Sequence, residues 1–168
     1  MPVQQPSQRR FAVMGTNTFN IANKLMQNQR LCRLLKYQVR DPFDKEKYED
    51  VDGVSLLNKQ IMIVPKIFDD STEKTSYVVA IFSNFITNSM NPDFKLSTVR
   101  FDVACPYDEW VLNDKSLRPY LMMQEIDDMF NGAQMAGIGT LQFVRAESIV
   151  LTPQIGGYSM LYQINEFN

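Results

Sequence analysis

The sequence of 168 residues contains no histidine. The chain therefore lacks the commonest general acid–base side chain and the commonest neutral metal ligand. A serine–histidine or cysteine–histidine dyad is excluded for the same reason. Cysteine is scarce too, because Cys32 and Cys105 stand alone in apolar surroundings. We expect two buried free thiols; a disulfide would require them to meet in the fold, and without histidine they make a poor zinc site.

Long hydrophobic runs and an excess of basic residues are also missing. No apolar stretch approaches the roughly 20 residues of a membrane helix. The first residues, MPVQQPSQRRF, contain no hydrophobic signal core, so we expect neither membrane insertion nor secretion. A net charge of −2 argues against a general binder of phosphate backbones, although it does not exclude a local basic patch. The ordinary hydrophobic content, 45%, predicts one globular domain.

The N-terminal third predicts an arm, a helix and an acidic loop. Residues 1–15 read as a flexible arm, either disordered or ordered on a neighbouring subunit. Helical spacing over 18–38 predicts one helix, which ends before Asp41-Pro42. Residues 41–58 are rich in aspartate and glutamate and lack periodicity. They predict a solvated loop; cation binding through carboxylates is the alternative, but the order of a calcium loop is absent.

The remainder predicts strands around a second helix. Strands are expected at 61–64, 77–86, 99–105, 137–145 (with 149–151 as a short continuation) and 158–164, with Gly156-Gly157 as a turn. The stretch Leu117–Gly137 predicts an amphipathic helix with Ser116 as its cap, Pro119 in its first turn and Asn131-Gly132 just past its end. The expected fold is α+β: arm–α–β–β–β–α–β–β over a domain at 16–168. Two principal helices then pack on a mainly antiparallel sheet, in two layers.

Residues with reactive chemistry are few. Asp127 and Asp128 are adjacent, so on a helix they point about 100° apart and cannot act as an acid–base pair. We expect their acidic face to be free for solvent or a subunit contact. The Gly137-Ile138-Gly139 sequence precedes a strand, which argues against a dinucleotide-binding loop. A stripe formed by Arg30, Arg33 and Arg40 predicts a solvated helix face or subunit salt bridges, with contact to DNA as the alternative.

Four local strings carry a resemblance to a known class of protein. They are NIANKLMQNQRLCRLLKYQVRDPF, NKQIMIVPKI, STVRFDVACPYDEWVLNDKSLRPYLMMQEIDDMFNG and GIGTLQFVRAESIVL. With these strings, most of residues 17–165 resembles the neck proteins of tailed bacteriophages, in the tail-terminator, tail-completion or head–tail joining group. The expected order of elements also suits this group, whose members are small α+β subunits.

The resemblance implies a non-catalytic virion protein, made in the host cytoplasm, without cofactor or metal. Its members form a ring, hexameric or dodecameric, that ends the tail tube and joins it to the head connector while DNA passes through without sequence-specific contact. Arg30, Arg33 and Arg40 would then face the lumen. The subunit contacts expected are Met90, Asn91, Phe94, Asp127 and Asp128. A portal-side adaptor ring and a non-catalytic phage binding module are the alternatives, and an enzyme ranks third.

Overall fold

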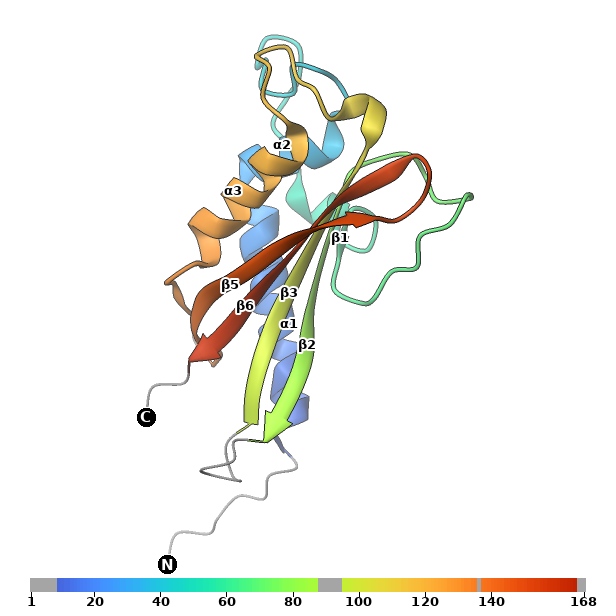
Figure 1. Ribbon diagram of the computed structural model, residues 1–168. Coiled ribbons are helices and arrows are strands. Elements are labelled where there is room, and N and C mark those ends of the chain that lie inside the picture. Colours follow the sequence, from blue (N-terminus) through green and yellow to red (C-terminus); the bar gives the residue numbers. More distant parts are fainter. Residues whose placement is uncertain (1–8, 88–94, 136, 166–168) are drawn as a thin grey trace, which may run out of the picture.

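Three α-helices and a six-stranded sheet form the described part of the chain, so the expected α+β class is confirmed. The computed structural model describes residues 9–87, 95–135 and 137–165. The helices are α1 (Arg9–Gln27), α2 (Gln29–Lys36) and α3 (Arg118–Phe130), with short 3₁₀ turns at Gly53–Leu56 and Tyr107–Glu109. The strands are β1 (Ile61–Met62), β2 (Tyr77–Thr87), β3 (Lys95–Pro106), β4 (Gln134–Met135), β5 (Gly139–Val150) and β6 (Ile155–Asn165). All three helices lie against one face of the sheet (Figure 1).

The sheet has the order β1-β2-β3-β6-β5-β4 and is antiparallel apart from the β1–β2 pair. The long hairpins β2–β3 and β5–β6 therefore meet at the centre, where Val103 lies opposite Tyr158. Bulges interrupt the register of β2 between Phe82 and Asn84 and that of β5 between Phe143 and Arg145. Such bulges increase the local twist of a strand.

The expected turn at Gly156-Gly157 was wrong, because both glycines lie inside β6. A Cβ at Gly157 would lie 1.9 Å from the carbonyl oxygen of Val103 on the neighbouring strand. Glycine is thus required here for close strand approach rather than for a turn. The connection from β5 to β6 is made instead around Thr152, whose hydroxyl accepts from the amide of Ile155 at 3.0 Å. Ile149 and Val150 continue the long strand β5, as expected, while Leu151 lies beyond its end.

The single helix expected over 18–38 is divided at Asn28. The Asn28 side chain accepts a hydrogen bond from the amide of Leu31 at 2.9 Å and so caps α2. Asparagine competes in this way with the backbone hydrogen bonds of a continuing helix. Helix α1 begins at Arg9, so residues 9–15 of the expected arm are helical, and residues 1–8 lie outside the described residues.

Within the stretch Leu117–Gly137, helix α3 ends at Phe130, just before the Asn131-Gly132 pair that was expected to end it. Its N-cap is Leu117 and not Ser116, whose hydroxyl bonds to Asp114, while Pro119 does occupy the first turn. The helix ends before Gly132, which has a positive φ of 72°. This left-handed conformation stops the helix, and residues 134–135 become β4.

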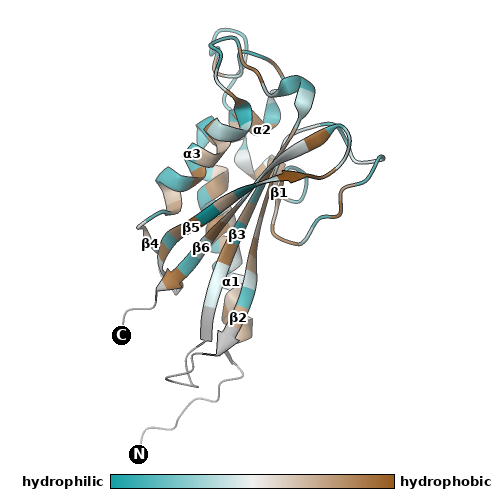
Figure 2. Ribbon diagram, in the orientation of Figure 1, coloured by the Kyte–Doolittle hydropathy of each residue, from teal (hydrophilic) through white to brown (hydrophobic). Residues whose placement is uncertain are grey.

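The core fills the space between the helices and the sheet. Phe101 of β3 stacks on Phe130 of α3 with ring centroids 4.8 Å apart and meets Tyr162 of β6 edge-on at 5.6 Å. All three rings are fully buried, and each contributes roughly 1.5–3 kcal/mol by burial. Cys32 and Cys105 are buried free thiols, as expected. Hydrophobic residues also gather at the outer tip of the β5–β6 hairpin (Figure 2).

Candidate interaction surfaces

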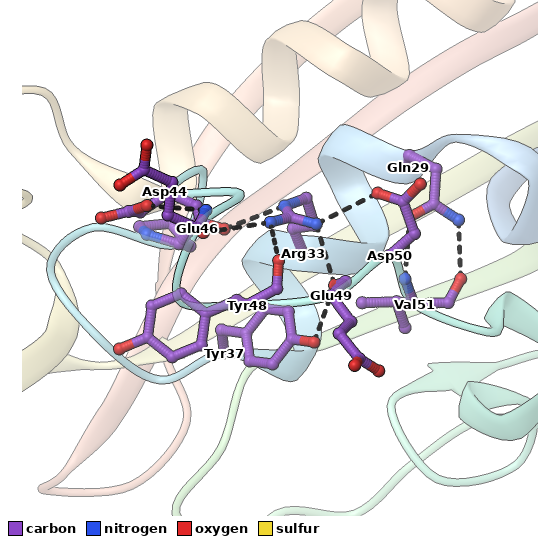
Figure 3. Close-up of polar contacts among 10 residues, drawn as sticks. Gln29, Arg33, Tyr37, Asp44, Glu46, Tyr48, Glu49, Asp50 and Val51 are labelled. Carbon is purple, nitrogen blue, oxygen red and sulfur yellow. Dashed lines mark hydrogen bonds and ion pairs between the residues drawn. The ribbon is translucent and has the colours of Figure 1, made fainter.

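Arg33 was expected to face a DNA channel, but its side chain is only 3% exposed. The guanidinium points into the loop that follows α2 (Figure 3). It donates to the carbonyl oxygens of Tyr48 at 2.6 Å and Glu49 at 2.9 Å, and Nε donates to that of Pro42 at 3.1 Å. Because its donors are engaged by the backbone of the loop, the lumen role for Arg33 was wrong. This arginine is an internal clamp.

Hydrogen bonds from Arg33 fix part of the segment 41–58 to α2, so this segment is not a purely solvated loop. The side chain of Gln29 adds two bonds to the backbone of Val51, at 2.6 and 2.9 Å. The loop carboxylates Asp41 and Asp44 lie 2.7 and 3.1 Å from the Lys47 ammonium. Hydrogen bonding from Lys47 lowers the pKa of Asp44. In the described ranges no group of three or more acidic or cysteine side chains is placed to hold a metal ion.

Arg30 and Arg40 are the two members of the expected stripe that are exposed. Arg30 forms an ion pair with Glu125 of α3 at 2.7 Å, and its guanidinium lies 4.3 Å from the ring centroid of Phe43. Arg40 is joined to the rest of the fold through its carbonyl, which accepts from the amide of Asn113 at 2.8 Å. The stripe is therefore interrupted, and only its two ends can meet a partner.

The two carboxylates of the expected acidic face of α3 also differ in their surroundings. Asp127 accepts a hydrogen bond from the hydroxyl of buried Tyr162 at 2.7 Å, so it is not free. Asp128 is exposed and accepts from Gln124 at 2.7 Å. Burial, together with the bond to Asp127, raises the pKa of Tyr162 well above that of a free tyrosine. The free-face expectation was wrong for Asp127, because β6 places a phenol beneath it.

Arg118 was not among the residues that the sequence patterns singled out. This side chain is fully buried at the start of α3 and donates to carbonyls on three different segments. Its guanidinium bonds to Leu34 at 2.5 Å, to Tyr37 at 3.1 Å and to Val39, and Nε bonds to Glu109 at 3.0 Å. Arg118 thereby satisfies the free carbonyls at the end of α2 and fixes α2 against α3. A charged residue directly before a helix-starting proline was the only signal, and it is not specific.

The other three expected contact residues, Met90, Asn91 and Phe94, lie outside the described residues. Exposed aromatic rings of α1 and β2 meet near the end of β2. Phe11 of α1 and Phe85 of β2 are 54% and 43% exposed and contact edge-on at 5.4 Å. Phe82 stacks on Phe85 at 6.3 Å. We call Phe11, Phe82 and Phe85 the α1–β2 patch.

A second apolar surface lies on the other side of the sheet order, between α3 and β5. Tyr120, Met123, Phe143 and Met160 line a hollow of about 270 Å³, with Gln124 and Asp127 as its polar rim. Tyr120 is 49% exposed and Phe143 39%. We call the four apolar residues the α3–β5 patch. Strand β3 separates β2, which carries the first patch, from β6 and β5, which carry Met160 and Phe143 of the second.

Polar side chains gather around Asp102 on the sheet face away from the helices. Asp102 of β3 accepts from Ser159 at 2.6 Å and from Arg100 at 3.1 Å. These side chains line a hollow of about 410 Å³ together with Arg145 and Glu147 of β5. Positive and negative groups alternate across this face, so it has no single sign of charge.

Comparison with protein-family models matches residues 28–164 to a family described as YomW. The chain belongs to the YomW family. The YomW match includes α2, α3 and almost the whole sheet, and it begins at the asparagine that divides α1 from α2. A comparison with curated proteins gave no match. No helix in the described part of this YomW protein is both long and apolar enough to span a membrane.

Proposed function

We propose that this YomW protein is a structural, non-catalytic subunit of a tailed-phage virion that forms a ring at the head–tail junction, ends the tail tube and joins it to the head connector. The resemblance of residues 17–165 to phage neck proteins supports this proposal. An α+β subunit with a long two-hairpin sheet is also the kind of unit expected in that class.

The observation that carries the proposal is the pair of exposed apolar patches. The α1–β2 patch and the α3–β5 patch belong to opposite sides of the sheet order, and they differ in composition. Exposed apolar patches on a small protein mark contacts with other proteins. A ring requires heterologous contacts, in which two different surfaces of each subunit meet. The two patches meet that requirement on a single chain.

Within such a ring, polar groups have a secondary role. Arg30 and Arg40 are the exposed cations left for a lumen that DNA crosses, and Asp128 remains exposed for a partner. A positively charged lumen would attract DNA without reading its sequence. We therefore assign Arg30 and Arg40, without Arg33, to this role.

The test measures the assembly of the purified protein by native mass spectrometry and negative-stain imaging. We expect a closed ring with a central hole. Phe85→Ser and Tyr120→Ser should each reduce the ring to smaller species, because each removes the exposed ring of one patch. Ile67→Ser is the matched control, since Ile67 is 88% exposed and belongs to neither patch. A monomer or a closed twofold dimer for the unaltered protein would refute the ring and favour a binding module.

A further inference from the structure

The outer edge of β5 has no partner strand in the part of the chain that the structure describes. Strand β4 pairs only with Gly139 and Thr140 of β5. Leu141 directs both its amide and its carbonyl outward, to the backbone of Ala133 and Gly132. The register with β6 and the alternation of an antiparallel ladder then direct the backbone groups of Ala146, Ser148 and Val150 outward as well.

The outer edge of β2 is open in the same sense. Strand β1 pairs only with Val78 and Val79, and the amide of Val78 donates outward to Gln60 at 2.8 Å. By the alternation of the β2–β3 ladder, Ala80, Phe82 and Phe85 direct their backbone groups away from β3. The described residues supply no strand beside them. The sheet thus has two open edges.

Natural edge strands are blunted by lysine, proline, short length, inward-pointing charges or bulges. Each of these two edges has a bulge, but both strands are long and lack lysine and proline on the open stretches proposed below. Strand β2 spans 11 residues, YVVAIFSNFIT, without a charge or a proline. Strand β5 spans 12 residues without lysine or proline, and its charged residues Arg145 and Glu147 alternate with those that direct backbone groups outward. Val150 on this edge is 79% exposed. Outside the bulges, long edges without lysine or proline favour a strand from another chain.

Chain direction identifies the partner strand. Three successive antiparallel pairs connect β2 to β3, β3 to β6 and β6 to β5, so β5 runs opposite to β2. In a ring, every copy has the same orientation relative to the axis. The β5 edge of one copy would therefore meet the β2 edge of the next in the antiparallel sense that the rest of the sheet uses. Pairing β5 with β5 of a second copy would leave both β2 edges open.

We propose that β5 of one subunit and β2 of the next pair edge to edge, through Ala146, Ser148 and Val150 on one side and Ala80, Phe82 and Phe85 on the other. This inference rests on the ring proposed above and identifies its interface. The two apolar patches flank these edges, since Phe82 and Phe85 lie on β2 and Phe143 on β5. The result is one sheet continued from subunit to subunit.

Cysteine cross-linking tests the pairing. One chain carries Ser148→Cys, and a second, differently tagged chain carries Phe82→Cys or Phe85→Cys, so that the scan samples more than one register. The native Cys32 and Cys105 are fully buried and stay unreactive. We expect a heterodimer on mild oxidation with at least one β2 position and none with Ser148→Cys alone. Val54→Cys, exposed in a 3₁₀ turn away from both edges, is the control position and should give no product.

A backbone variant supplies an independent readout. Ser148→Pro removes an outward amide that has no partner within the described chain, so the monomer should fold, with Ser148→Thr as control. We expect the proline variant to raise the concentration for half-assembly at least about tenfold. A cross-linked homodimer from Ser148→Cys alone, or rings without any β5–β2 product, would overturn this interface while leaving the ring proposal intact. Absence of both rings and cross-links would overturn both proposals.

Discussion

Replacing Arg33 by methionine tests whether this residue is a structural clamp. Methionine keeps an apolar stem of similar length but removes every donor of the guanidinium. Three carbonyl contacts of 2.6–3.1 Å would be lost, with a longer one to Asp44 at 3.4 Å. The ion pair to Asp50 at 3.2 Å adds little, because that carboxylate is 76% exposed.

The expected loss follows from these contacts. A hydrogen bond to a charged group contributes about 1.5–3 kcal/mol, and removing one partner from a buried charged network costs about 3–5 kcal/mol. Water can reach some of the freed carbonyls, since Tyr48 is half-buried and Glu49 exposed. We therefore expect Arg33→Met to lower the free energy of unfolding by about 3 kcal/mol.

Urea unfolding followed by circular dichroism measures this loss, and limited proteolysis reports on the loop. Arg33→Met should expose residues 41–52 to cleavage. The matched control is Arg30→Met on the same helix, where one ion pair at a 58% exposed side chain should contribute less than about 1 kcal/mol. Arg33→Lys should lie between the two, because lysine keeps the charge but cannot reproduce the planar set of donors.

Equal losses for Arg33→Met and Arg30→Met would refute the clamp. So would an unchanged cleavage pattern in the loop, since the reasoning requires that the guanidinium holds these residues in place.

Three further predictions concern other parts of the fold. Arg118→Met should destabilise the protein by about 3–5 kcal/mol in the same unfolding assay, because carbonyls at the end of α2 lose their donor. A smaller loss of stability than that of Arg30→Met would contradict this. Gly157→Ala should lower the free energy of unfolding by more than about 2 kcal/mol, because its Cβ would clash with Val103. The control is Gly15→Ala in α1, where a Cβ meets nothing within 4 Å and should stabilise the protein by up to about 1 kcal/mol. Similar melting temperatures for the two variants would count against the close strand approach. Burial raises the pKa of Cys32 from 9.0 to about 11 and that of Cys105 from 9.0 to about 12. A group whose pKa is raised in the folded state contributes stability that is complete below its unfolded pKa and is lost as the pH rises. The free energy of unfolding should therefore fall above pH 9.0. A free energy of unfolding that stays constant at alkaline pH would refute this.

Alternation predicted the central strands because one face of each strand is buried. Val99, Phe101 and Val103 occur at every second position, and all three point into the core. Spacing likewise located α3, and the Asn131-Gly132 pair indicated its end. The left-handed Gly132 and the pairing of β4 with β5 decide where that helix stops.

The arginines show where periodicity fails. Arg30 and Arg33 are three residues apart and read as one stripe, yet one is at the surface and the other is buried. The loop that folds back over α2 makes this difference, and no local pattern encodes that path. The same holds for Asp127, whose carboxylate accepts a hydrogen bond from Tyr162, 35 residues further along the chain.

The sequence by itself determined the α+β class and the positions of the buried strands, and its lack of histidine excluded histidine-dependent catalytic dyads. These features depend on residue types and on local period. Tertiary structure alone decided which charged side chains are internal clamps, which glycines allow close strand approach, and which strand edges stay open. Those properties depend on partners distant along the chain, so only the folded arrangement of β2 and β5 on opposite sides of one sheet brings the proposed interface into view.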